Sequence, residues 1–114
     1  MSRLKCTRGF YEAEAVALSL KFVDRAHVTK IVFGFSATPT TSENMTVTLD
    51  SAGGSDHDTV LHTKDMVAEG VESSYVMDFE AGEMQFIAED GIDIAYANTD
   101  VADISVQVYY EVTP

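Results

Sequence analysis

The residue types best suited to metal chemistry lie between positions 50 and 62. His57 and His62, with Asp56 and Asp58, form the one cluster in the sequence that has the ligand types of a transition-metal site. Five positions separate the two histidines, which places their side chains on opposite faces of a regular strand. The cluster is therefore interpreted as a polar loop and strand end, and no metal ligand is predicted.

Carboxylates around Gly53 and Gly54 offer the oxygen ligands that Ca²⁺ takes in proteins, namely Asp50, Asp56 and Asp58. Their spacing does not match an EF-hand loop, and the closing glutamate of such a loop is missing. An ordinary acidic hairpin loop is the favoured interpretation, and calcium binding by this loop is left open.

Catalytic patterns are absent from the sequence. Glu89 with Asp90, or Asp100 with Asp103, could act as acid and base on a glycoside, but such sites need a cleft and usually aromatic sugar platforms, and the chain has no tryptophan. No phosphate-binding glycine loop and no nucleophile elbow occurs. The single cysteine, Cys6, excludes an internal disulfide and is interpreted as incidental. We therefore predict a protein that is not an enzyme and has no catalytic residue, cofactor or metal.

Charge is distributed unevenly along the chain. The net charge is −12 at pH 7, yet residues 1–8 hold three basic residues and no acidic one. The rest of the chain has four basic and nineteen acidic residues, a balance of −15. A surface with this excess of acidic residues repels phosphate backbones and anionic lipid. Neither nucleic acid nor a membrane is therefore expected as a partner. No apolar run follows the first basic residues, so a signal peptide is not expected.

The elements that position these residues are predicted to be β-strands, because apolar residues recur with a period of two. The predicted strands cover about 16–22, 31–35, 45–50, 59–63, 72–79, 84–88, 92–96 and 104–112. Good helix formers precede the first of these strands, but a helix would scatter its large apolar side chains around the whole circumference.

About eight short strands, separated by turn signals roughly every 8 to 14 residues, predict an all-β fold. The expected architecture is a single antiparallel β-sandwich or jelly roll over residues 13–114, preceded by an N-terminal arm over residues 1–12. The predicted core residues are Val16, Leu18, Leu20, Phe22, Ile31, Phe33, Val47, Leu49, Ile94, Val106 and Val108.

Three segments, 37–51, 58–65 and 89–100, occur in an order that resembles small β-sandwich proteins encoded among the virion genes of tailed bacteriophages. The resemblance extends over roughly residues 28–110 and contains strand and turn motifs without a catalytic signature. It implies a structural virion protein, most specifically a capsid decoration or cement protein that stabilises the head shell. Its partners would be the major capsid protein or other virion subunits, and a homo-oligomer, with a trimer favoured, is expected. Its location would be the virion, assembled in the host cytoplasm.

Two alternatives stay open: a tail or neck component, and a carbohydrate- or ligand-binding β-sandwich module. For the virion interpretation, the basic residues of the arm would steer it towards an acidic surface, while aromatic residues would hold the complex. Tyr110 is predicted to face the core and Tyr109 an outer surface, where tyrosines favour interfaces. The residues expected to contact a partner are Arg3, Lys5, Arg8, Phe10, Tyr11 and Tyr109.

Overall fold

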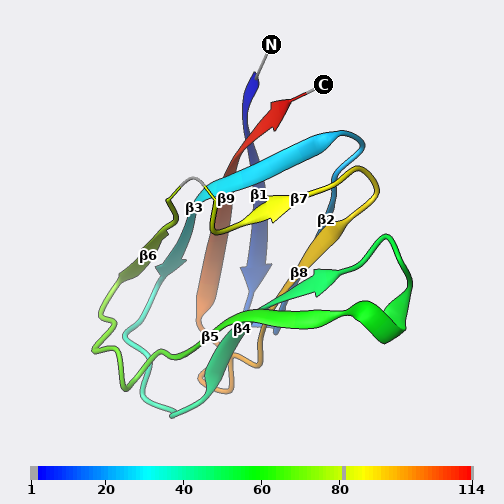
Figure 1. The fold of residues 1–114 in the computed structure, drawn as a ribbon. Helices are drawn as coiled ribbons and strands as arrows, with labels where there is room; N and C mark the ends of the chain where they lie inside the picture. The colour runs from blue at the N-terminus through cyan, green and yellow to red at the C-terminus, as the bar shows by residue number, and fades with distance from the viewer. Residues whose placement is uncertain (1–2, 81, 114) are drawn as a thin grey trace.

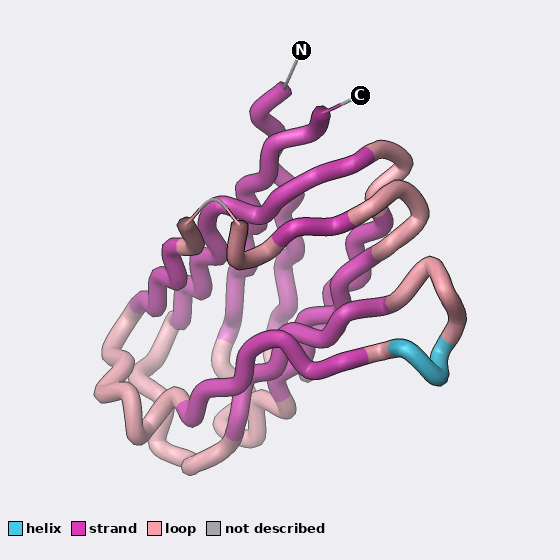
Figure 2. Tube along the Cα trace, viewed as in Figure 1, coloured by secondary structure: helices cyan, strands magenta, loops and turns pink. Residues whose placement is uncertain are grey.

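Nine β-strands make up most of the residues that this computed structural model describes, 3–80 and 82–113 (Figure 1). The strands are β1 (Arg3–Glu12), β2 (Val16–Lys21), β3 (Arg25–Phe35), β4 (Asn44–Asp50), β5 (Thr59–Asp65), β6 (Ser74–Asp78), β7 (Gln85–Phe86), β8 (Gly91–Tyr96) and β9 (Asp103–Thr113). A short 3₁₀ helix, η1 (Ser55–His57), lies between β4 and β5, and loops gather at the ends of the sandwich (Figure 2). Within the described ranges, no helix is long and apolar enough to cross a membrane.

The strands form two antiparallel sheets that pack face to face. In the first, sheet A, the order is β1-β9-β3-β6, and β7 pairs with β3 beyond the end of β6. The second, sheet B, has the order β2-β8-β4-β5. In Figure 1, β1 and β6 lie on opposite sides of the β9-β3 pair. The predicted all-β antiparallel sandwich is thus confirmed.

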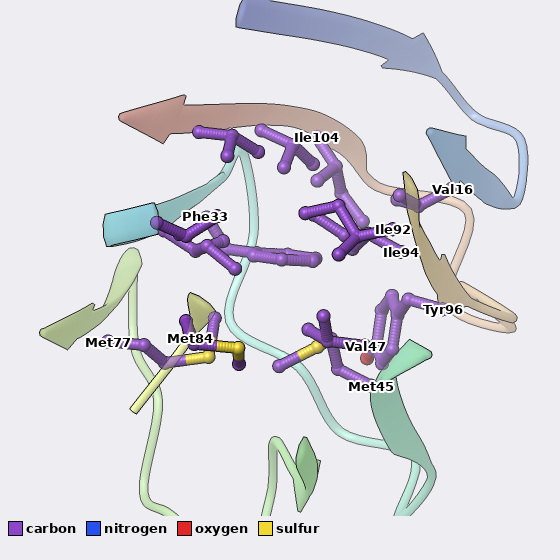
Figure 3. Packing of buried hydrophobic residues seen from close by; sticks show 14 of the residues in the cluster. Val16, Phe33, Met45, Val47, Met77, Met84, Ile92, Ile94, Tyr96 and Ile104 are labelled. Carbon is purple, nitrogen blue, oxygen red and sulfur yellow. The ribbon is translucent and has the colours of Figure 1, made fainter. Parts of the chain in front are cut away.

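The core lies between the two sheets and contains the predicted residues. Eight of them are buried: Val16, Phe22, Ile31, Phe33, Val47, Ile94, Val106 and Val108. Leu18, Leu20 and Leu49 are partly buried and pack against that cluster. Four buried methionines complete the packing, and Figure 3 shows three of them, Met45, Met77 and Met84, among the branched and aromatic side chains. Flexible thioether chains suit the irregular spaces that branched residues leave.

Two buried polar side chains fix the turns around β8. Asn98 has a left-handed backbone (φ 54°), and its Nδ2 donates to the carbonyl oxygens of Glu14 and Ala102, each at 2.8 Å. The Asp90 carboxylate accepts the backbone N–H of Ala52 at 2.8 Å. Both side chains satisfy backbone groups that the sheets leave unpaired, which makes their burial tolerable.

The N-terminal segment departs from the sequence-based expectation. Residues 3–12, assigned above to an arm outside the sandwich, form edge strand β1 instead and pair with β9 from Arg3–Val112 to Glu12–Asp103. The part of the predicted arm at residues 1–2 lies outside the described residues. The inward positions of β1 include Lys5, Thr7 and Gly9, and only Tyr11 among them places a large ring against the core. Its alternation therefore gives no signal of burial, although β9 provides a full-length partner.

Candidate protein interface

Strand β1 turns its apolar side chains away from the core. Residues directly opposite each other in an antiparallel pair share a face. Gly9 lies opposite Val106 and therefore faces inward, so the even-numbered residues of β1 face outward. Among these, Leu4 is 73% exposed and Phe10 is 71% exposed. An edge strand with apolar residues on its solvent face presents surface that a partner protein would bury.

The outer edge of β1 is also unpaired. In the described part of the chain β1 pairs with β9 alone, so one side of a ten-residue strand presents free N–H and C=O groups. Such an edge is a template for pairing with another strand. It can thus offer backbone hydrogen bonds and side-chain contacts to the same partner.

A shallow hollow of about 400 Å³ adjoins Phe10 on the outer face of sheet A. Phe10, Ser105, Gly34 and Ser74 form one row across the sheet. Ser105, Gly34 and Ser74 have small side chains or none, so the surface of the sheet is recessed next to the Phe10 ring. The hollow extends the apolar surface of β1 across two neighbouring strands.

The sequence-predicted contact residues divide between the two faces of β1. Arg8 lies on the outer face with Phe10, whereas Lys5 lies opposite Tyr110 on the inner side and lines a small hollow with Val23 and Asp24. No carboxylate lies within 4.0 Å of the Lys5 or Arg8 side chain among the described residues. Arg3 belongs to β1, but the placement of its side chain is not described.

The two tyrosines of the prediction have different positions. Tyr11 is partly buried, packs against the core and lies over Gly9, where an added Cβ would come within 2.7 Å of its hydroxyl. Burial raises the pKa of this hydroxyl, and the nearby Glu14 carboxylate adds to the effect. Tyr109 lies opposite Cys6 on the outer face and donates to Gln107 Oε1 at 2.5 Å. Tyr109 therefore extends the outer surface, while Tyr11 mainly supports the sandwich.

The histidines and aspartates of the metal hypothesis are not brought together. His57 is exposed in η1, outside any strand. His62 lies on β5, and its ring is perpendicular to that of Phe79, with the two ring centroids 5.8 Å apart. Burial lowers the pKa of His62, as does nearby Lys64. Across the described ranges no three His, Cys, Asp or Glu side chains are placed to hold a metal ion.

The aspartates of the calcium hypothesis are distributed between the end of β4 and the start of β5. Asp58 accepts the backbone N–H of Ser51 at 2.8 Å and so closes the turn after β4. Asp50 ends β4 and Asp56 lies in η1. The three aspartates thus lie along the connection from β4 to β5.

Three carboxylates at the far end of the sandwich clamp loops to one another. Asp100 accepts the Thr40 backbone N–H at 2.7 Å and the Thr41 hydroxyl at 2.6 Å. These bonds lower the pKa of Asp100 to about 2. Glu43 accepts the Thr99 N–H at 2.8 Å, and Asp65 accepts the hydroxyl of Ser42.

Tyr96 lies beneath these carboxylates. It is 3% exposed, and burial, with a contribution from the carboxylates of Glu43, Asp100 and Asp65, raises its pKa to about 12. The acidic end is therefore an architectural clamp over a neutral tyrosine. Strand β1, its free edge and the adjoining hollow together form one surface that the fold itself does not use. No protein-family model matches this sequence, and no curated protein matches it.

Proposed function

We propose that this chain is a structural virion protein, most specifically a decoration or cement protein that binds the head shell of a tailed bacteriophage as an oligomer. The observation that supports a binding role is β1, an unpaired edge strand with Leu4 and Phe10 exposed and with basic residues on an acidic body. The folded chain alone is not stabilised by apolar residues on that face, because they stay exposed to water. Contact with another protein would bury them and so contribute to binding.

The chemistry of β1 suits a protein partner with acidic surface. Burying a Phe or Leu side chain contributes about 1.5–3 kcal/mol each, which makes Phe10 and Leu4 the anchors of the contact. Basic residues mainly accelerate encounter with an acidic surface. An acidic body stays soluble at high copy number and is repelled by a packaged genome.

The proposal is tested on particles. Heads from a phage that lacks the gene are mixed with purified protein, and occupancy is measured by sedimentation and cryo-electron microscopy. Wild-type protein is expected to fill regular positions on the shell. The double variant Leu4→Ser, Phe10→Ser is expected to bind at least roughly tenfold more weakly, as hot-spot anchors do. Val23→Ser is the matched control, because Val23 is 76% exposed in the turn between β2 and β3.

Two results would redirect the proposal. Density on the tail or neck instead of the shell would favour a tail or neck component. Absence of the protein from purified virions would contradict a virion role altogether. The hollow beside Phe10, with Glu12 and Asp103 at its rim, supports a carbohydrate-binding module as the second candidate. Chemical-shift changes at these residues on titration with oligosaccharides would support that candidate.

A further inference from the structure

We propose that the free edge of β1 pairs with strand β6 of a second copy of this chain, so that sheet A continues from one subunit into the next. This deepens the proposed structural function, because it names what covers the free edge of β1. The contact is head to tail: β1 of each copy meets β6 of its neighbour. Such a contact forms a ring where the rotation closes and a filament where it does not.

The strand directions fit this contact. Neighbouring strands of sheet A are antiparallel along the path β1-β9-β3-β6, so β1 and β6 run in opposite directions. A copy placed edge to edge, with its core on the same side, therefore presents an antiparallel strand to β1. Antiparallel pairing is slightly more stable per residue than parallel pairing.

The backbone groups also match. In antiparallel sheets, a residue that exchanges hydrogen bonds with one neighbour presents no such pair to the other. Arg8, Gln107, Val32 and Val76 form one row across the four strands of the path. Hydrogen-bonded and non-hydrogen-bonded pairs alternate along this row, and three strand pairs separate Arg8 from Val76. The backbone groups of Arg8 and Val76 therefore either both point to the free edge of their strand or both point away from it. Outward-facing residues of β1 can thus lie directly opposite outward-facing residues of β6.

Charge selects β6 among the available edges. The two edge strands of sheet B each carry a basic residue, Lys21 in β2 and Lys64 in β5. Strand β6 contains no basic residue, it includes Asp78, and Glu72 and Glu80 flank it. Opposite charges across the contact steer it and fix its partner.

One register satisfies both charge and apolar contacts. When Arg8 lies opposite Asp78, Phe10 lies opposite Val76, which is 48% exposed, and Cys6 lies opposite Glu80. A slip of two residues in one direction would place Arg8 opposite Val76 and Phe10 opposite Ser74, which loses the ion pair and the apolar pair together. A slip in the other direction would keep Arg8 opposite an acid, Glu80, but would place Phe10 opposite Asp78, so the first register is favoured.

A symmetric contact between two β1 strands is the competing arrangement. It would bring the basic residues of both copies together and leave the acidic edge at β6 uncovered. Like charges directly opposite each other destabilise strand pairs. The head-to-tail contact instead joins the most basic edge of the chain to the most acidic one.

The native cysteine reports the register. Cys6 is exposed and unpaired, so Glu80→Cys is expected to form a disulfide with Cys6 of the neighbouring copy under mild oxidation. Non-reducing gels would then show a ladder or a closed oligomer. Asp56→Cys, in exposed η1, is the matched control and is expected to stay mainly monomeric on the same gel. The Cys6→Ser version of Glu80→Cys is expected to lose the ladder.

A charge exchange tests the same contact without cysteine chemistry. Arg8→Asp and Asp78→Arg are each expected to weaken self-association roughly five- to tenfold in analytical ultracentrifugation, and the double variant to restore it to within about threefold. Restoration distinguishes a direct contact from a general loss of stability, because both side chains are exposed.

Several results would overturn the inference. Disulfide dimers of wild-type protein through Cys6 would show the symmetric β1 contact. Equal crosslinking of Glu80→Cys and Asp56→Cys, failure of the double charge variant to recover, or a monomer at all concentrations would remove the β1–β6 contact. Each of these results leaves binding to heads measurable, so the failure of this inference is distinguishable from the failure of the proposed function.

Discussion

Replacing Val106 by Asp tests the packing of the two sheets. Val106 is 0% exposed on β9, with Gly9 of β1 and Phe33 of β3 opposite it on either side. The change removes a buried valine, worth about 1.5–2 kcal/mol, and buries a carboxylate without a partner. The total cost is expected to be at least about 3 kcal/mol. The free energy of unfolding of a natural domain is about 5–15 kcal/mol, so the variant is expected to have little stability left.

The assays are urea unfolding and thermal unfolding at pH 7, both monitored by far-UV circular dichroism. With an unfolding entropy near 2.1 cal/mol/K per residue, 3 kcal/mol corresponds to a fall in melting temperature of about 12 °C. Val23→Asp carries the same substitution at a 76% exposed position and is expected to stay within about 0.5 kcal/mol of wild type. If Val106→Asp does not fold, Val106→Ala is expected to cost about 2–3 kcal/mol. Equal midpoints for both Asp variants would refute the placement of the Val106 side chain in the core between the two sheets.

Three further outcomes are expected. Because hydrogen bonds hold the pKa of Asp100 at about 2 against an ordinary 3.8, its contribution to stability is complete above pH 3.8 and is lost as the pH falls through about 2. Asp100→Asn should therefore flatten the dependence of the urea midpoint on pH in that window. Asn98→Ala leaves two carbonyl oxygens without their donor and should cost about 2–3 kcal/mol in thermal unfolding. Deletion of residues 1–12 uncovers β9, and it should lower the urea midpoint and cause aggregation visible by light scattering.

The sequence predicts the inner strands well for a definite reason. In β4, β9 and the second half of β3, large apolar residues occupy the inward positions and smaller or polar ones the outward positions, so the alternation coincides with burial. Residues 25–30 of β3 were not predicted as strand, and a bulge between Val28 and Lys30 interrupts the alternation there. Strand β9 is the clearest case: Ile104, Val106 and Val108 are all buried. A period-two pattern of that kind has one stable solution, with its apolar face on the core.

The candidate site was predictable only in part. The sequence indicates which residue types occur near the N-terminus, but an arm without defined structure has no inner or outer side. Because residues 3–12 form a strand, successive side chains point to opposite faces of the sheet. Phe10 is therefore exposed, while Tyr11 packs against the core. Tyr110 does face the core as predicted, because it continues the inward series of β9. The hollow beside Phe10 depends on two small residues that are distant in the sequence, Gly34 and Ser105. They become neighbours only because β3 pairs with β9.

The two faces of β1 meet two different requirements. Among its inward positions, Thr7 and Gly9 are small, and Tyr11 packs against the core at the end of the strand. Its outward positions hold Leu4 and Phe10, which add nothing to that packing and expose apolar surface to water. A strand selected only for folding would favour the reverse distribution. The inverted pattern is best explained by a second contact, made on the outer face and free edge of β1 after the sandwich itself has formed.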